Sequence, residues 1–531
     1  MKQSRNPVMN RILIIFVAGL LMGMTAAPVN AWYLAWFALA PLWIAVVQLR
    51  QQNVKFMILL GAVWAMAYHG QALFWITGVH PMTWMGVPWL LSLLIAIFCW
   101  LFITFWGVFL VISWCLGMVL WQHFKDKYHL RRLPLFNSIS QISEAKIILR
   151  IVFGVAWWCI LEGIWSQGSL WWTSLSFSQS PNNLSLLHLT QLSGPTTLTA
   201  AIVAVNGILA EIFITTRDDK GLVKNTSFLL LIPIIIYGGL FWVGSNLYHR
   251  PLKDVAQNAI HLGIIQGNIP NEIKLNPIGW RKAIAGYTKG YQSLAQKDLD
   301  AILTPETALP FRWQDIKADS SFYQVVQAEK IPTFLGAFGS NQQKFTNSLL
   351  AVDQSGKLVD SYDKIKLVPL GEYIPFESVL GNFISRLSPL EARLLAGNPQ
   401  QSFNTPIGQV IAGICYDSAF SEVFRQQAQL GGELILTAAN NAHYSQIMPA
   451  QHHAQDIMRA VESDRWLARA TNTGYSAIIN PKGETVWISN INTYELHSDT
   501  IFRRQTQTPY VRFGDWLIWV LFFFGLATLV L

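Results

Sequence analysis

Long apolar stretches dominate the first half of the chain and return once at its end. Most of them reach the roughly 20 residues that a helix needs to cross a bilayer. They lie near residues 12–28, 31–48, 57–78, 88–121, 147–167, 189–214, 226–244 and 514–531. The pattern predicts about eight transmembrane helices: seven in an N-terminal membrane domain of residues 1–245, and a last one within residues 512–531.

The polar loops between these stretches differ in charge. Lys and Arg occur in the N-terminal tail and in every second loop, whereas the alternate loops around residues 29–30, 79–87 and 168–188 contain neither. Because basic loops stay in the cytoplasm, both ends of the chain are predicted to be cytoplasmic and the segment after the seventh span to lie outside. A signal peptide cleaved after Ala31 is an alternative for the first stretch, and it leaves that outside placement unchanged.

Between residues 250 and 505 short apolar runs alternate with stretches of helical periodicity, which predicts one α/β domain. The expected strands are residues 261–266, 301–304, 333–337, 348–352, 410–414, 433–436 and 476–479. The expected helices include residues 280–297, 418–429 and 450–470. Since open α/β sheets bind ligands beyond the carboxyl ends of their strands, we look for chemistry at those ends.

Composition favours a membrane protein over a soluble one. The 531 residues are 52% hydrophobic and only 13% charged, with 38 Lys and Arg against 30 Asp and Glu. The basic residues follow the alternate loops and form no nucleic-acid-binding motif, so we expect no nucleic acid partner. Cys99, Cys115 and Cys159 fall in expected spans, and Cys415 has no partner for a disulfide within the α/β domain.

Three expected strand ends in the α/β domain carry reactive side chains. Glu306 follows one strand, Cys415 ends another, and Lys364 precedes a second carboxylate, Glu372, across a turn. A thiol needs a base, and a cation favours both thiolate and oxyanion. We therefore expect Glu306 to take the proton of Cys415 if an apolar site raises its pKa, Lys364 to stabilise negative charge, and Glu372 to hold Lys364. Taken singly, Cys415 also reads as a buried apolar residue, Glu306 as a helix cap and Lys364 as a solvated charge.

These motifs resemble the nitrilase superfamily, and with the surrounding spans they resemble the apolipoprotein N-acyltransferase family. The family stretch Y-x-K-x-x-L-V-P-F-G-E is matched at residues 362–372, with Leu370 in place of the phenylalanine, and residues 266–270 and 469–474 also look like family segments. The resemblance implies an α-β-β-α sandwich over residues 250–505 that needs no cofactor. It also implies a catalytic triad with supporting residues, namely Glu306, Lys364 and Cys415, supported by Glu372, Tyr416 and Asp417.

The resemblance further implies what the enzyme does and where. Cys415 would take a fatty acyl group from a phospholipid as a thioester and pass it to the N-terminal amine of a diacylated apolipoprotein, the final step of lipoprotein maturation. The enzyme would be a monomer in the bacterial cytoplasmic (inner) membrane, with its catalytic domain on the outer, periplasmic side. We expect no metal, because His443, His452 and His453 lack the spacing of a zinc site.

Besides Leu370, three further motif sites depart from the family. Asp417 stands where the family has glutamate, Leu275 stands where a tryptophan is common, and residues 440–445 read N-N-A-H-Y-S instead of N-D-A-W-F-G. These departures predict a divergent member whose acyl pocket or acceptor preference differs. A membrane-anchored nitrilase-like amidase or hydrolase is the first alternative. A transporter and an inactive scaffold are further alternatives, and the intact triad counts against both.

Two features have open interpretations. Residues 376–387 place apolar side chains at helical spacing, which predicts either a lid that dips into the membrane interface or an ordinary core helix. Ionisable side chains in or near spans are functional candidates by default, and here they are His69, Glu162 and Glu211.

Overall fold

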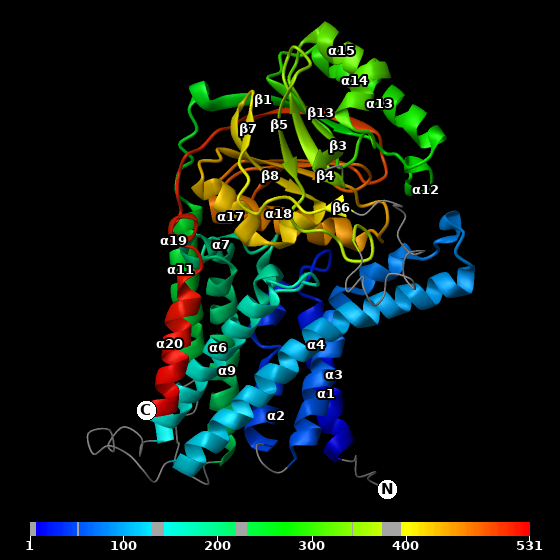
Figure 1. Cartoon of the computed structure of the whole chain (residues 1–531). Coiled ribbons are helices and arrows are strands. Elements are labelled where there is room, and N and C mark those ends of the chain that lie inside the picture. The colour runs from blue at the N-terminus through cyan, green and yellow to red at the C-terminus, as the bar shows by residue number, and fades with distance from the viewer. Residues whose placement is uncertain (1–6, 50–52, 129–142, 219–230, 342–343, 374–393) are drawn as a thin grey trace. The chain divides into compact units, whose positions relative to one another are not determined.

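The computed structural model describes residues 7–49, 53–128, 143–218, 231–341, 344–373 and 394–531. The chain divides into two compact units, drawn in Figure 1. A helical unit comprises Met1–Phe74, Ile97–His249 and Asp515–Leu531, and an α/β unit comprises Trp75–Ala96 and Arg250–Gly514. Residues 75–96 thus belong to the α/β unit, although they include the end of one expected span, residues 57–78, and the start of the next, residues 88–121. The lid stretch, residues 376–387, lies outside the described residues.

Long apolar helices make up the helical unit. Asn53 caps one of them by accepting a hydrogen bond from the Phe56 N–H (3.0 Å), and Pro195 opens another where its missing N–H costs nothing. The helices are α1 (Pro7–Gly23), α2 (Ala40–Leu49), α3 (Val54–Ala72), α4 (Trp89–Tyr128), α6 (Ser143–Trp165), α7 (Leu184–Leu187), α8 (Thr190–Ser193), α9 (Pro195–Asp218), α11 (Leu231–Tyr248) and α20 (Trp516–Val530), with 3₁₀ turns η1 (Trp32–Trp36) and η5 (Leu175–Gln179). Helix α4 has its first turns, to Ala96, in the α/β unit.

Five described segments are long and apolar enough to cross a membrane. They are Trp32–Leu49, Trp89–Lys127, Ala145–Trp165, Pro195–Thr216 and Leu231–Tyr248, and the shorter apolar helices are Val8–Gly23 and Trp516–Val530. The structure therefore supports a helical membrane region with several spans. The expected total of about eight stays a prediction.

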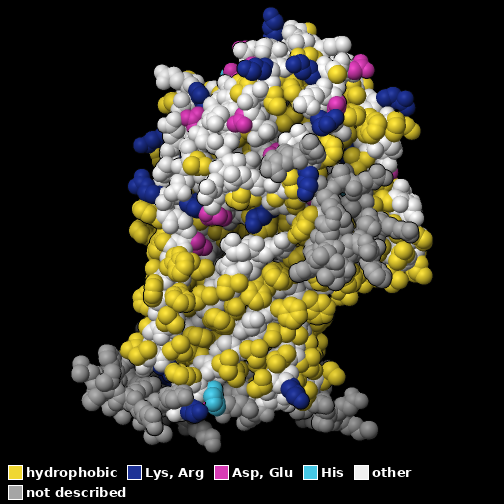
Figure 2. Space-filling view, viewed as in Figure 1, with side chains coloured by type: hydrophobic (Ala, Val, Ile, Leu, Met, Phe, Trp, Pro, Cys, Tyr) yellow, Lys and Arg dark blue, Asp and Glu magenta, His cyan; other side chains and the backbone are white. Residues whose placement is uncertain are grey.

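Large apolar side chains remain exposed on the outer faces of these helices. Figure 2 shows them covering the visible face of the helical unit. Examples on α4, α11 and α20 are Phe98, Phe102, Phe109, Ile234, Ile235, Trp242, Trp519, Phe523 and Phe524. Because so extensive an apolar surface is unfavourable in water, a bilayer is its natural solvent.

The ionisable residues of the spans have partners inside the helical unit. Glu211 on α9 accepts a hydrogen bond from Arg150 Nε on α6 (2.7 Å). Glu162 accepts one from Thr199 Oγ1 (2.7 Å). His69 Nδ1 lies 2.8 Å from Thr173 Oγ1. The two carboxylates thus link α6 to α9, and packing explains their presence in the spans.

Two mixed sheets form the framework of the α/β unit. The first sheet has the order β13-β1-β2-β3-β4-β5, with β6 paired to β4, and the second has the order β12-β11-β10-β9-β8-β7. The strands of the first sheet are β1 (Ala259–Gln266), β2 (Ala301–Leu303), β3 (Thr333–Asn341), β4 (Lys344–Val352), β5 (Leu358–Asp363), β6 (Leu394–Leu395) and β13 (Glu495–Phe502). Those of the second are β7 (Phe403–Thr405), β8 (Gly408–Ile414), β9 (Leu434–Ala439), β10 (Leu467–Thr471), β11 (Ala477–Ile479) and β12 (Thr485–Ile488). Strands β1, β2 and β3 run parallel, as do β8, β9 and β10.

Helices flank each sheet of the α/β unit, as Figure 1 shows. Helices α13 and α15 share a buried core with the first sheet, in which Tyr291 and Phe322 meet edge to face. Helix α17 packs on β8, where Phe424 fills the space beside Gly413. The helices are α12 (Asn271–Lys274), α13 (Pro277–Ala295), α14 (Trp313–Asp319), α15 (Ser321–Glu329), α17 (Ser421–Gln429), α18 (Ile447–Ser463) and α19 (Pro509–Phe513), with 3₁₀ turns η2 (Phe74–Val79), η3 (Thr83–Met85), η6 (Ala256–Asn258) and η7 (Cys415–Ala419).

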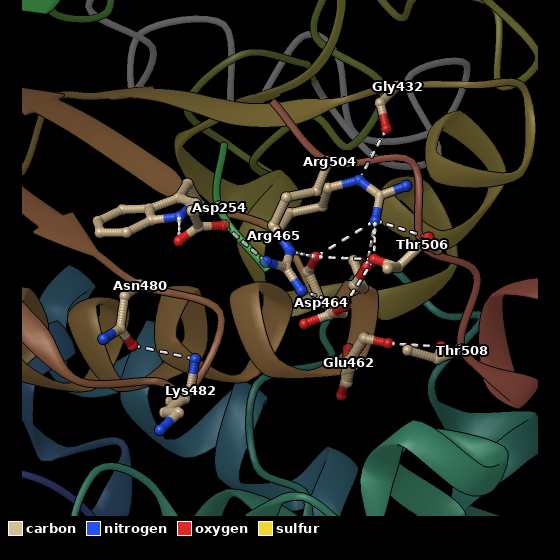
Figure 3. A network of polar contacts seen from close by, with 12 residues as sticks. Asp254, Gly432, Glu462, Asp464, Arg465, Asn480, Lys482, Arg504, Thr506 and Thr508 are labelled. Atoms are coloured by element: carbon tan, nitrogen blue, oxygen red, sulfur yellow. Dashed lines mark hydrogen bonds and ion pairs between the residues drawn. The ribbon is translucent and has the colours of Figure 1, made fainter. Parts of the chain in front are cut away.

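A polar network ties together the two ends of the main α/β segment (Figure 3). Arg504 pairs with Asp254 near the start of the segment (2.6 Å) and with Asp464 after α18 (2.9 Å). Arg465 donates to the backbone carbonyls of Gly432 (2.9 Å) and Thr506 (2.7 Å). The network fixes where the chain enters and leaves the sheets.

The expected strands all overlap observed ones, but the expected helix over residues 450–470 is wrong at its end. Helix α18 stops at Ser463, because Asp464 takes a left-handed conformation (φ 52°), and Leu467–Thr471 forms strand β10. That strand is buried along its whole length, so it lacks the alternation of a half-buried strand and reads as a continuation of the helix. The polar strand β13 was not predicted, because Glu495–Phe502 has few apolar positions.

Candidate active site

Glu306 lies in a tight turn directly after strand β2. The next residue, Thr307, has φ 48°, a left-handed conformation that is unusual for a β-branched side chain. Strand β3 passes so close that a Cβ on Gly336 would lie 1.9 Å from the Pro305 carbonyl oxygen. Glycine at position 336 therefore permits the approach that presents Glu306 in the interior.

The Glu306 carboxylate is buried and hydrogen-bonded on both oxygens. Its Oε1 accepts from Lys364 Nζ (3.0 Å) and Asn347 Nδ2 (2.7 Å), and its Oε2 accepts from the Asn440 backbone N–H (2.7 Å). A second lysine, Lys274 on α12, donates from Nζ to the Glu306 carbonyl oxygen (3.0 Å). Both sheets thus converge on this residue, since Asn347 lies in β4 and Asn440 follows β9.

Lys364 follows strand β5 and lies between two carboxylates. Its Nζ is 3.0 Å from oxygens of both Glu306 and Glu372. Glu372 is held in turn by the Val368 backbone N–H (2.8 Å) and by Asn347 Nδ2 (2.9 Å). The turn expected between Lys364 and Glu372 brings the two side chains together as the sequence predicted.

Cys415 begins the 3₁₀ turn η7 at the end of strand β8 and has φ 48°. Asp417 braces this turn: its Oδ2 accepts from the Ile414 N–H (3.0 Å) and from Tyr362 Oη (3.0 Å), and its Oδ1 accepts from the Lys366 N–H (2.8 Å). The aspartate that departs from the family pattern therefore joins the nucleophile turn to the lysine stretch. It is fully buried and does so with three hydrogen bonds.

Tyr416 packs its ring edge-on against Phe420 (5.1 Å between centroids). Burial raises its pKa, and the nearby Tyr373 and Tyr444 act in the same direction. The phenol therefore stays protonated. Tyr416 thus directly follows Cys415 in the chain and lies among other aromatic side chains.

The cluster sets the resting protonation state of the candidate triad. Burial raises the pKa of the Cys415 thiol to about 12, with a further increase from the Glu306 charge that Lys364 opposes. Burial alone would raise the pKa of Glu306, but Lys364 and Lys274 outweigh it and the pKa is lowered. Burial opposes the charge of Lys364, yet Glu306 and Glu372 hold its pKa well above the ordinary value. The raised pKa that was set as the condition for Glu306 to act as base is not found, because the charges of Lys364 and Lys274 favour the carboxylate.

Two further motif segments join the sheets instead of entering the cluster. Gln266, at the end of β1, accepts through Oε1 from Ser476 Oγ (2.6 Å) and Ser489 Oγ (2.8 Å). The backbone N–H of Asn268 donates to the Asn472 carbonyl oxygen (2.8 Å). These segments hold β1 of the first sheet against the second sheet.

The segment of residues 440–445 contacts residues 75–79 of the same unit. The Tyr444 and Trp75 rings meet edge to face at 4.8 Å. A Cβ on Gly78 would lie 2.3 Å from the Ser445 nitrogen, so the two backbones nearly touch. The substituted motif residues thus have packing partners that come from far away in the sequence.

The three histidines point to different partners. His443 Nδ1 lies 2.7 Å from Asn271 Nδ2, His452 Nε2 lies 2.8 Å from the Cys415 carbonyl oxygen, and His453 Nε2 lies 3.0 Å from Thr485 Oγ1. Within the described ranges no three His, Cys, Asp or Glu side chains gather as a metal site would require.

Sequence reasoning missed Lys274 and Asn347, and it considered His452 only as a metal ligand. Asn347 lies inside a strand and His452 inside a helix, where single polar residues give no signal. Lys274 had one available signal, because it stands four residues after the motif at residues 266–270.

Comparison with known proteins agrees with this geometry. Residues 262–501 match the carbon-nitrogen hydrolase family, and residues 18–208 match the apolipoprotein N-acyltransferase N-terminal domain. An apolipoprotein N-acyltransferase of Nostoc sp. is 50% identical over 93% of this chain and 94% of its own. One of Synechocystis sp. is 48% identical over 94% of this chain and 96% of its own. A crystallised amidase from Nesterenkonia sp. is 17% identical, with a TM-score of 0.36 over 49% of this chain and 95% of its own. With a cysteine, a lysine and a glutamate gathered in its α/β unit and a second unit of apolar helices, the chain belongs to the apolipoprotein N-acyltransferase family, within the nitrilase superfamily.

Proposed function

We propose that this apolipoprotein N-acyltransferase works through a thioester on Cys415, taking a fatty acyl group from a phospholipid and passing it to the N-terminal amine of a diacylated apolipoprotein. One observation carries the proposal. Glu306 and Lys364 come from the first sheet and Cys415 from the second, and the charges of both side chains act on the buried thiol.

The first half-reaction forms the thioester. Because the resting thiol is protonated and Glu306 is a carboxylate, the proton of Cys415 moves to Glu306 as the sulfur attacks the ester carbonyl carbon. Two of the three Lys364 N–H groups are directed at carboxylates, and the third can stabilise the oxyanion. The carbon–oxygen bond then breaks, and Glu306 gives the proton to the departing alkoxide oxygen, which becomes the hydroxyl of the lysophospholipid.

The second half-reaction forms the amide. The neutral amine of the acceptor attacks the thioester carbon, and Glu306 takes one proton from its nitrogen. The carbon–sulfur bond breaks, and the Cys415 thiolate receives that proton back. The net reaction exchanges an ester for an amide, and the enzyme ends in its starting protonation state.

The arrangement in the membrane completes the proposal. Residues 250–505 form an α-β-β-α catalytic domain on the outer, periplasmic side of the bacterial inner membrane, anchored by residues 1–245 and 512–531 through about eight spans. The basic residues of alternate loops support this orientation. The enzyme acts as a monomer. Because the active site lies at the bilayer, each acyl CH₂ avoids the cost of about 0.8 kcal/mol of entering water.

Mass spectrometry of the acceptor peptide tests the proposal. Purified full-length protein is incubated with phospholipid and a synthetic diacylated lipopeptide. The wild type should add one N-linked acyl chain and Cys415→Ala none. In addition, wild type without acceptor should gain the mass of one acyl group on the peptide that contains Cys415.

Cys99→Ala is the matched control, because Cys99 lies on α4 in the helical unit and is expected to leave transfer intact. Free fatty acid without acylated peptide would instead support hydrolysis by water. Acyl transfer by folded Cys415→Ala would contradict the thioester route.

A further inference from the structure

The nucleophile turn η7 holds Cys415 in a conformation that its own side chain disfavours. A left-handed φ of 48° is unfavourable for a residue other than glycine, so surrounding contacts must maintain it. Asp417 supplies some of them by binding the Ile414 and Lys366 N–H groups. The carbonyl groups of the turn need separate partners.

Helix α18 supplies those partners from two positions on one face. His452 Nε2 donates to the Cys415 carbonyl oxygen (2.8 Å), and Arg459 Nη1 donates to the Ser418 carbonyl oxygen (3.0 Å). The two residues are seven apart, which is about two helical turns. Both side chains are fully buried. The helix thus binds the turn at its first and fourth residues.

His452 is oriented by hydrogen bonds at both ring nitrogens. Since a carbonyl oxygen can only accept, Nε2 carries the proton, and Nδ1 accepts from Asn441 Nδ2 (3.2 Å). Arg469 Nη1 donates to the His452 carbonyl oxygen (3.3 Å) and pairs with Asp456 on the same helix. Burial lowers the pKa of His452 to about 3, and Arg469 acts in the same direction. The imidazole is a neutral donor.

We propose that His452 is a positioning residue for acyl transfer, which holds the Cys415 carbonyl so that the nucleophile turn keeps the backbone direction from which the sulfur reaches the acyl carbon. This inference rests on the proposed thioester route through Cys415. A histidine beside a cysteine would suggest a base for the thiol. Here His452 contacts the backbone carbonyl of Cys415, and the base is Glu306.

The test compares a reaction that needs the Cys415 sulfur to point in one fixed direction with a reaction that does not. Acyl-enzyme formation from bilayer phospholipid is followed by intact mass, and alkylation of Cys415 by iodoacetamide is followed by peptide mapping. His452→Leu should slow acylation about 100-fold, because a small misplacement of reacting groups has effects of that size. Alkylation by a small mobile reagent should change less than about threefold, since it does not require the fixed approach.

Three variants make the comparison specific. His452→Gln keeps an amide donor for the same carbonyl and should retain acylation within about fivefold of wild type. In His452→Asn the side chain is polar but too short to reach the carbonyl, so this variant should behave like His452→Leu. It replaces His452→Leu if that variant does not fold. His453→Leu, the adjacent buried histidine that contacts Thr485 instead, should leave both rates unchanged.

Equal losses of acylation and alkylation in both His452→Leu and His452→Asn would overturn the proposal, because the sulfur environment as a whole would have changed. So would unchanged acylation in these variants, or a loss in His452→Gln as deep as theirs, which would indicate a proton-transfer role. Failure of the wild type to form an acyl-enzyme would count against the thioester route itself and is seen before any variant is compared.

Discussion

Two lysines and two glutamates of the candidate site come from the first sheet and its connections, whereas the proposed nucleophile and the hydrogen bonds that hold its backbone come from the second. Two ammonium and two carboxylate groups meet on the first-sheet side, where Lys364 bridges Glu306 and Glu372 and Lys274 binds behind Glu306. On the second-sheet side, Cys415 has neutral His452 behind its carbonyl.

The first sheet therefore sets the protonation states of the site, and the second sets the direction of the Cys415 side chain. Buried charges are tolerated when each has an opposite partner, and the balanced set around Lys364 meets that condition. Variants of the first sheet should therefore alter reactivity and its pH dependence. Variants of the second should alter stability and the geometry of attack.

The largest expected effect comes from Glu306→Gln, which removes the base but keeps the shape of the side chain. Loss of a general base typically costs 10²- to 10⁴-fold, so we expect acyl transfer to fall about 10³-fold. Glu372→Gln is the matched control, because it removes an equal charge beside Lys364 and leaves the base in place. It should cost about tenfold. Losses of equal size, measured by initial rates of lipopeptide acylation, would mean that Glu306 acts only as a counter-ion.

Sequence alone could single out the three residues of the proposed triad because they stand at strand ends, and Glu372 because a turn was expected between it and Lys364. It could not reveal Asn347, which bridges Glu306 and Glu372 from the middle of a strand. Nor could it show that Lys274 lowers the pKa of Glu306, since its burial depends on the turn between α12 and α13. Polar residues buried in regular elements acquire their roles only when distant segments meet.

The same limit applied to secondary structure. The end of α18 depends on the left-handed Asp464, which Arg504 and Thr506 hold from a distant part of the chain. No local signal marks that position, so the expected helix ran on into β10. The motifs at residues 266–270 and 469–474 were recognised, but their job of joining the two sheets required the fold.

Asp417→Asn tests the second-sheet side and should change the pH dependence of stability. Burial raises the pKa of Asp417 to about 6, whereas in the unfolded chain it is about 3.9. The folded state binds this proton more tightly, so the contribution is fully present below about pH 4 and is lost as the pH rises to about 6, a change of about 3 kcal/mol. Across that range the melting temperature of wild type in detergent should fall by about 6 to 12 °C relative to the variant.

The variant also loses an acceptor for at least one of three donors. We therefore expect acyl transfer to fall about tenfold at neutral pH, as a looser nucleophile turn would produce. Asp360→Asn, on strand β5 but bonded to Asn404 instead of the turn, should leave transfer unchanged. A melting-temperature difference that does not vary between pH 4 and 6 would show that Asp417 is not the group that titrates.

The smallest expected effect comes from Lys274→Met on the first-sheet side, and it is mainly a displacement in pH. Lys274 lowers the pKa of Glu306 by its charge and binds the carbonyl oxygen of the same residue. Without that ammonium the Glu306 pKa should rise. As the pH falls, Glu306 then becomes protonated, and unable to accept the Cys415 proton, at a higher pH than in the wild type. The acid limb of kcat/KM for acyl transfer should move upward, with a loss of about tenfold on that limb and little change at alkaline pH. Lys282→Met, an exposed lysine on α13, should leave the profile unaltered. A uniform loss at every pH would mean that Lys274 acts through its hydrogen bond to the Glu306 backbone, and the first sheet would then position the base as well as tune it.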